Sequence, residues 1–205
     1  IEAKSKGDED KIVISLNKLL EEDPALKLDR NSETKEVLLS GLGQIHVETA
    51  IEKLKRKFNV EALLKTPKVP YRETIKKKVR VQGKHKKQTG GHGQYGDCWI
   101  QVEPLPRGAG FEFVDAIVGG VIPKTYIPAV EKGVIESARK GVLAGFPTVD
   151  FKVTLDDGSF HAVDSSEMAF KVAGSLAFKK AVVDANPVLL EPIMEVAVTT
   201  PDEYM

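Results

Sequence analysis

Two closely spaced prolines near the end of the first third of the chain constrain its fold more than any other feature. Pro67 and Pro70 lie in the stretch 66–70, between segments that have regular apolar periodicity. Prolines end regular secondary structure and stiffen the backbone into an extended conformation. With 205 residues, the chain is long enough to form two hydrophobic cores. We therefore predict a boundary here, with one domain over residues 1–68 and a second over residues 69–190.

The residues before this boundary have the pattern of a split β-α-β-β-α-β domain. Apolar residues from Ile12 to Leu20 share one helical face and predict a helix that ends before Pro24. Helical spacing also predicts a second helix over residues 47–58. Short strand-like segments precede, separate and follow the two helices. This order predicts a small α+β domain.

The residues after the boundary predict a second α+β unit. Alternating apolar residues indicate strands around 79–81, 98–102, 111–114 and 149–155, and Asp157-Gly158 is typical of a turn. One amphipathic helix is predicted around residues 130–142. Another starts at Asp164 to Glu167, where a capping acceptor is followed by Glu three residues later. A last strand is predicted over residues 193–199.

Charged residues are unevenly distributed along the chain, although the formal net charge is zero. Seven lysines and arginines, and no acidic residue, lie between Ile75 and Gly96. Residues 84–96 of this stretch also contain amides, a tyrosine and four glycines. Such a loop attracts phosphates over about 8–10 Å in physiological salt, and its glycines let backbone N–H groups approach a ligand. We predict that it contacts RNA; a solvated basic hairpin loop without a partner is the alternative.

Several functional classes are disfavoured by what the sequence lacks. The single cysteine, Cys98, cannot form an internal disulfide, and its strand-like surroundings favour a packed side chain over a nucleophile. No apolar run reaches the roughly 18 residues of a membrane span. The phosphate-binding pattern G-x-x-x-x-G-K-[ST] is absent from the sequence. No nucleophile, base and orienting group come together as an enzyme requires. We expect a cytoplasmic protein with no metal, no membrane partner and no nucleotide site in this chain.

Four segments resemble signatures of bacterial elongation factor G, in that family's order and spacing. They are Ser40–Glu48 (SGLGQIHVE), Gln88–Gly96 (QTGGHGQYG), Val163–Phe170 (VDSSEMAF) and Leu189–Met194 (LLEPIM). Together they span nearly the whole chain. Many members of the family have arginine where His92 stands, so the choice between the main elongation factor and a paralogue stays open.

The resemblance implies a fold for each part of the chain. Residues 1–68 would be the family's third domain, which is ferredoxin-like. Residues 69–190 would be its fourth domain, a ribosomal-protein-like α+β fold with a left-handed βαβ crossover. Crossovers of this kind are right-handed as a general rule, so the left-handed crossover is implied by the resemblance alone. Residues 191–205 would be the truncated start of the fifth domain.

The resemblance also implies a function for the whole protein: a ribosome-stimulated GTPase, binding GTP and Mg²⁺ elsewhere, that promotes movement of tRNA and mRNA through the ribosome. A paralogue for ribosome recycling, or one that protects ribosomes from an antibiotic, is the alternative, and a general RNA-binding module is a further one. The implied partners are rRNA, ribosomal proteins, A-site tRNA and mRNA, and a monomer is expected. The implied RNA-contacting residues are Lys84, Lys86, Lys87, Gln88, Thr89, Gly90, Gly91, His92, Gln94, Tyr95, Ser159 and His161.

Several of these side chains also have purely structural interpretations. Without the resemblance, His161 is a surface side chain after a turn, and His46 is a histidine at the edge of an apolar helix face. Asp164 and Glu167 are explained by helix capping rather than as paired catalytic carboxylates. Trp99 is interpreted as a core residue rather than as a platform for a base.

Overall fold

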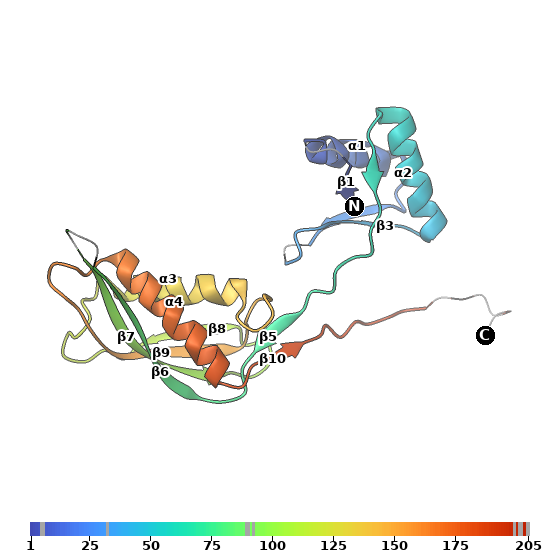
Figure 1. Cartoon of the computed structure of the whole chain (residues 1–205). Coiled ribbons are helices and arrows are strands. Elements are labelled where there is room, and N and C mark those ends of the chain that lie inside the picture. The colour runs from blue at the N-terminus through green and yellow to red at the C-terminus, as the bar shows by residue number, and fades with distance from the viewer. Residues whose placement is uncertain are drawn as a thin grey trace. The chain divides into compact units, whose positions relative to one another are not determined.

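The computed structural model describes residues 1–4, 7–31, 33–88, 91, 93–198, 200 and 203. The chain divides into two compact units, Ile1–Pro70 and Tyr71–Met205. Figure 1 shows both units in ribbon form. In the part of the chain that the structure describes, none of the helices combines the length and the apolar character of a membrane-spanning segment.

The first unit has the predicted order of elements. Strand β1 pairs antiparallel with β4, and β2 pairs antiparallel with β3. The nitrogen of Ile1 donates a hydrogen bond to the carbonyl of Val37 at 2.7 Å, which joins the start of β1 to β3. The elements are β1 (Glu2–Ala3), α1 (Glu9–Glu22), β2 (Lys27–Arg30), β3 (Val37–Ser40), α2 (Gln44–Phe58) and β4 (Ala62–Leu63).

The core of the first unit lies between its two helices and its strands. Ile12, Leu16 and Leu19 of α1 are buried, as their helical spacing predicts, and pack with Leu54 of α2 and Val60. Helix α1 begins with two acidic residues, and α2 ends with three basic ones. Both arrangements stabilise the helices, because acidic residues near the N-terminus and basic residues near the C-terminus interact favourably with the helix dipole. Local charge and apolar periodicity therefore both favour these helices.

The second unit is built on a four-stranded sheet with the order β6-β7-β9-β8. The neighbours β8 and β9 are parallel and are connected through α3, which forms a βαβ unit. A separate antiparallel pair joins β5 to β10. The elements are β5 (Arg72–Thr74), β6 (Val79–Lys87), β7 (Gln94–Pro104), β8 (Phe111–Asp115), α3 (Ile127–Lys140), β9 (Phe151–Ser159), α4 (Glu167–Asp184) and β10 (Val188–Leu190).

Helices α3 and α4 lie on the same face of this sheet (Figure 1). The buried face of α4 includes a row of small residues, Ala169, Ala173 and Ala177, beside the glycines of the strands. A Cβ atom added to Gly83 would lie 2.2 Å from the carbonyl oxygen of Ala173. One added to Gly96 would lie 2.5 Å from that of Ala169. Glycine at both positions therefore lets α4 approach the backbone of β6 and β7.

The strand predicted over residues 193–199 is not found. Instead β10 ends at Leu190, and residues 191–198 have no regular secondary structure; Thr199 lies outside the described residues. Ile193, Val196 and Val198 of this segment are largely exposed. An alternating apolar pattern makes a stable strand only when a neighbouring strand pairs with it, and the described residues supply none here.

Glu73 is fully buried and organises the loop that follows α3. Its carboxylate accepts hydrogen bonds from the backbone N–H groups of Val142, Leu143, Ala144 and Phe146 at 2.7–3.2 Å. Burial raises the pKa of Glu73, and the four backbone donors lower it by more, so the pKa lies below the ordinary value of 4.5. The charged form of Glu73 therefore stabilises the folded chain.

We predict that Glu73→Gln lowers the free energy of unfolding by about 2–3 kcal/mol at pH 7, because an amide cannot accept from all four donors. A folded-state pKa below that of the unfolded chain stabilises the protein above about pH 4.5, and the stabilisation is lost as the pH falls through the folded-state pKa. Urea unfolding at several pH values measures how the stability of wild type and variant depends on pH. The difference between wild type and variant should shrink on acidification; a difference that is constant with pH would contradict the assignment.

Candidate nucleic-acid interface

The basic stretch forms the end of a long β-hairpin. Strands β6 and β7 pair without interruption from Val79 opposite Val102 to Lys87 opposite Gln94. The sequence placed residues 84–96 in a loop, and this was wrong for most of them: residues 84–87 and 94–96 are in the strands. We call residues 84–96 the tip hairpin.

Two cations of the tip hairpin are available to a ligand. Lys86 and Lys87 are exposed, and in the described part of the chain no carboxylate lies within ion-pair distance of either. Successive side chains of a strand point to opposite faces, so the two lysines extend on both sides of the hairpin. Beside them, Oε1 of Gln94 accepts from Nε2 of His85 at 2.9 Å.

The segment after β9 lies beside the tip hairpin. Asp157-Gly158, predicted as a turn, is part of β9, which continues to Ser159. A Cβ on Gly158 would lie 2.4 Å from the carbonyl oxygen of Asp97, so glycine is required here for close packing rather than for a turn. The chain turns later, between Phe160 and Ser165. We call residues 159–165 the tip loop.

His161 has a defined orientation in the tip loop. Its Nδ1 atom accepts hydrogen bonds from the backbone N–H groups of Val163 at 3.3 Å and Asp164 at 3.2 Å. Its own backbone N–H donates to Oγ of Ser165 at 2.9 Å. The side chain is 55% exposed. In a neutral imidazole with Nδ1 as acceptor, Nε2 carries the proton, so His161 offers one N–H donor to a ligand.

Asp164 and Ser165 connect the tip loop to the tip hairpin. Asp164 accepts from the backbone N–H of Gly93 through its side chain at 3.0 Å and from that of Tyr95 through its carbonyl at 2.8 Å. The hydroxyl of Ser165 donates to the carbonyl of Tyr95 at 2.9 Å. The prediction that Asp164 caps α4 was therefore wrong: Ser166 is the cap, and its Oγ accepts from the N–H of Ala169 at 3.2 Å.

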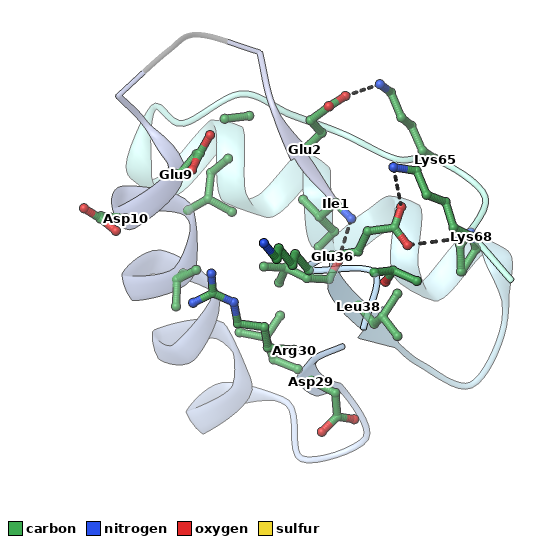
Figure 2. A pocket seen from close by; sticks show the side chains of 18 of the residues that line it. Ile1, Glu2, Glu9, Asp10, Asp29, Arg30, Glu36, Leu38, Lys65 and Lys68 are labelled. Carbon is green, nitrogen blue, oxygen red and sulfur yellow. Dashed lines mark hydrogen bonds and ion pairs between the residues drawn. The ribbon is translucent and has the colours of Figure 1, made fainter. Parts of the chain in front are cut away.

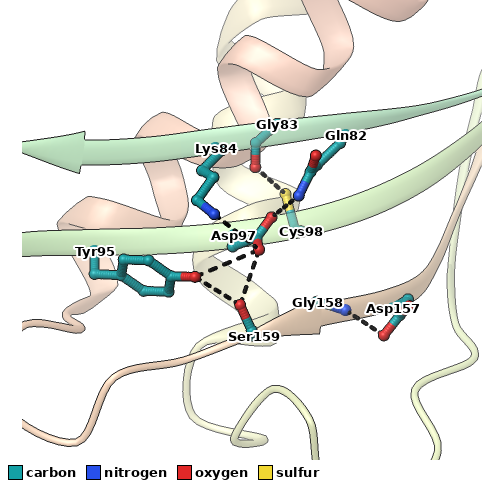
Figure 3. A network of polar contacts seen from close by, with 9 residues as sticks. All are labelled: Gln82, Gly83, Lys84, Tyr95, Asp97, Cys98, Asp157, Gly158 and Ser159. Atoms are coloured by element: carbon teal, nitrogen blue, oxygen red, sulfur yellow. Dashed lines mark hydrogen bonds and ion pairs between the residues drawn. The ribbon is translucent and has the colours of Figure 1, made fainter.

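Tyr95 is the aromatic side chain between the two segments. Its ring centroid lies 6.4 Å from that of His161, and Nζ of Lys84 lies 5.6 Å from the Tyr95 ring. Nζ of Lys84 also lies 4.0 Å from Oδ2 of the buried Asp97 (Figure 3). The charge of Lys84 is thus partly compensated inside the protein, whereas the described residues supply no such partner for Lys86 or Lys87.

The structure brings most of the predicted contact residues to one end of the second unit. Thr89, Gly90 and His92 lie outside the described residues. Sequence reasoning missed Asp97, which looked like one of several polar residues in an alternating strand, and it gave Asp164 a different role. The predicted residues that the structure places in or beside the tip hairpin and the tip loop are Lys84, Lys86, Lys87, Gln88, Gly91, Gln94, Tyr95, Ser159 and His161.

Trp99 is only half-buried and lies on the sheet face opposite the helices, so the core prediction was wrong. The guanidinium of Arg80 lies 4.6 Å from its ring centroid and donates to both oxygens of Asp156 at 2.7 and 3.1 Å. The indole ring is covered by an ion-paired arginine, which makes it a structural platform for that arginine.

The other candidate reactive groups have structural roles. Cys98 is buried, and this burial, together with the neighbouring Asp97 charge, raises its pKa to about 12, so the thiol is inert. Nε2 of His46 lies 2.9 Å from Oδ2 of Asp23, and its Nδ1 accepts from the backbone N–H of Leu42 at 3.0 Å. His46 therefore fixes the start of α2. Among the described residues, no cluster of three metal-binding side chains is present.

A cavity of about 600 Å³ lies in the first unit, between α1, β1 and β3 (Figure 2). Charged side chains at its edge pair with one another, Lys65 with Glu2 and Lys68 with Glu36, and Glu36 also accepts from the backbone N–H of Lys68 at 3.0 Å. Its lining contains no histidine and no cysteine.

The fold defines an α+β protein of two compact units, with a basic hairpin end in the second unit. Comparison with protein families identifies the domains. Residues 1–66 match the model described as Elongation Factor G, domain III, and residues 67–186 match the model described as Elongation factor G, domain IV. The chain belongs to the elongation factor G family.

A solved structure supports this assignment. A crystal structure of a protein from Thermus thermophilus is 54% identical to this chain and superposes on it with a TM-score of 0.78. The match covers 92% of this chain and 28% of that chain. The chain therefore spans less than a third of the length of this relative, and both matched family domains lie within that span.

We predict that the neutral imidazole of His161 is the Nε2–H tautomer, because two backbone N–H groups point at Nδ1. Long-range proton–nitrogen correlation spectra at about pH 8, where histidine is neutral, distinguish the two tautomers. The Nδ1 resonance should have the shift of an unprotonated nitrogen. A spectrum of an Nδ1–H imidazole would contradict the proposed tip geometry.

Proposed function

We propose that this chain is the ribosome-contacting part of an elongation factor G-type GTPase, and that its tip contacts RNA of the decoding centre during movement of tRNA and mRNA. The observation that carries this proposal is the convergence of Lys86 and Lys87, which have no ion-pair partner among the described residues, with the oriented imidazole of His161 at one end of the second unit. The membership of the chain in the elongation factor G family supports it.

The chemistry of the tip suits recognition of shape rather than of sequence. A-form RNA presents 2′-hydroxyls and phosphates in a wide, shallow minor groove. Lysines attract the phosphates, while an imidazole N–H and the amides of Gln88 and Gln94 can bond hydroxyls of any sequence. A factor that acts at every codon must accept every codon–anticodon pair, and contacts of this kind make no distinction among them.

Nucleotide chemistry belongs elsewhere in this proposal. The two matched family domains extend over residues 1–186, and neither is a nucleotide-binding domain. GTP and Mg²⁺ would bind in another part of the whole protein, whose GTPase activity this chain would convert into movement on the ribosome. We further propose a cytoplasmic location and action as a monomer, with rRNA, ribosomal proteins, A-site tRNA and mRNA as partners.

We predict that the chain binds 70S ribosomes with an affinity that falls steeply as the salt concentration rises. Replacing one phosphate-binding lysine should reduce the slope of log K against log salt by about 0.7–0.9. Lys86→Ala and Lys87→Ala should each have this effect in a fluorescence titration. Lys179→Ala, an equal charge change at an exposed site near the other end of α4, is the matched control. Binding that is insensitive to salt, or equally sensitive to all three changes, would argue against the tip as the interface.

We predict that His161→Ala in the full-length protein slows translocation about ten- to a hundredfold while leaving ribosome-stimulated GTP hydrolysis nearly unchanged. One hydrogen bond to a charged RNA group contributes about 1.5–3 kcal/mol, and its loss in the transition state gives this range. Rapid-kinetic translocation and GTPase assays on one preparation measure both steps. Equal losses in both, or no loss of translocation, would refute the role of the tip loop.

A further inference from the structure

Among the described residues of the second unit, three carboxylates are buried: Glu73, Asp97 and Asp150. Two of them bond to backbone groups and so fix loops. Glu73 holds the loop after α3, and Asp150 accepts from the N–H groups of Gly108 and Gly110 at 3.1 and 2.9 Å. The described partners of the Asp97 carboxylate are side chains instead. A buried carboxylate destabilises the fold unless it is hydrogen-bonded. The hydrogen bonds that Asp97 requires therefore hold those side chains in place.

The partners of Asp97 come from three strands that meet below the tip (Figure 3). From β6, the amide nitrogen of Gln82 donates to Oδ1 at 2.7 Å. From the end of β9, the hydroxyl of Ser159 donates to Oδ2 at 2.8 Å. From the start of β7, the hydroxyl of Tyr95 lies 2.7 Å from Oγ of Ser159 and 3.5 Å from Oδ2 of Asp97. One carboxylate thus connects the tip hairpin with the first residue of the tip loop.

The directions of these hydrogen bonds follow from the number of protons. A carboxylate only accepts, and a hydroxyl carries one proton. Because Ser159 donates its proton to Asp97, its Oγ accepts from Tyr95. The order is Tyr95 to Ser159 to Asp97, and the charge of Asp97 sets it. The same charge lies 4.0 Å from Nζ of Lys84, which lies near the ring of Tyr95.

We propose that Asp97 is a positioning residue for RNA recognition: it holds Tyr95 and Ser159 so that the tip hairpin and the tip loop present their donors to the same RNA surface. Asp97 is only 6% exposed and does not itself contact the ligand. It acts through Tyr95, whose ring lies beside that of His161. This inference rests on the proposed function, because it assigns a supporting role within the same interface.

The test removes the charge of Asp97 while keeping its size. In Asp97→Asn, an NH₂ group replaces one acceptor oxygen, so the charge that orders the hydrogen bonds is removed and Lys84 loses its counter-charge. Tyr95→Phe removes only the first hydroxyl of the chain and keeps the ring. Asp156→Asn is the matched control, since Asp156 is an acid on the same sheet that pairs with Arg80.

The experiment measures the affinity of the 205-residue chain for 70S ribosomes, with thermal unfolding of each variant in parallel. We expect Asp97→Asn and Tyr95→Phe to weaken binding about three- to tenfold, the fold-change of one neutral hydrogen bond, and Asp156→Asn to have no effect. A double-mutant cycle distinguishes positioning from general destabilisation. Asp97→Asn should weaken binding clearly less in the His161→Ala background, because its effect passes through the tip loop.

Each outcome bears on a different claim. If Lys86→Ala and His161→Ala weaken binding but Asp97→Asn and Tyr95→Phe do not, the positioning role is refuted and the proposed function stands. Equal effects of Asp97→Asn with and without His161 also refute it. If Asp97→Asn fails to fold, Tyr95→Phe replaces it in the test. Its effect on binding, measured with and without His161→Ala, then supports or refutes the positioning role by the same criteria. If neither Lys86→Ala nor His161→Ala has an effect, the proposed function fails, and the positioning role with it.

Discussion

The close approach of α4 to the backbone of β6 and β7 is the contact on which the tip depends. At Gly83 and Gly96 an added Cβ would lie 2.2 and 2.5 Å from carbonyl oxygens of the helix, so main chain packs against main chain. Such a contact has one geometry, because no side chain can adjust to a shift. It fixes where α4 begins, and the tip loop ends directly before that point. The tip loop is therefore held against the tip hairpin by the core.

Buried carboxylates and exposed lysines have different electrostatic roles in the second unit. Glu73, Asp97 and Asp150 are buried and fully engaged in hydrogen bonds or ion pairs that order loops and side chains. Arg80 is neutralised by Asp156 halfway along the hairpin, whereas Lys86 and Lys87 at its end have no such partner among the described residues. The end of the hairpin therefore carries exposed positive charge close to the tip loop.

Three errors of the sequence analysis share one physical cause, since the same residue type serves more than one purpose. Gly158 was interpreted as a turn residue, but it is needed because Asp97 and Ile122 pack against its backbone. Asp164 has the sequence position of a helix cap, yet its carboxylate bonds to Gly93, which is 71 positions away. Trp99 has the composition of a core residue and lies on the other face of the sheet. In each case a partner distant in the sequence decided the outcome.

Periodicity and charge alone determined the order of elements in the first unit, the core faces of α1 and α2 and the basic character of the tip hairpin. These features depend on neighbours within a turn of helix or a pair of strand positions, so they can be predicted from the sequence. Only the tertiary structure decided that Asp97 joins Tyr95 to Ser159, that Asp164 joins the tip loop to the tip hairpin, and that Lys84 is compensated while Lys86 is not. Those contacts join residues whose proximity depends on sheet register and helix packing, and periodicity contains no information about either.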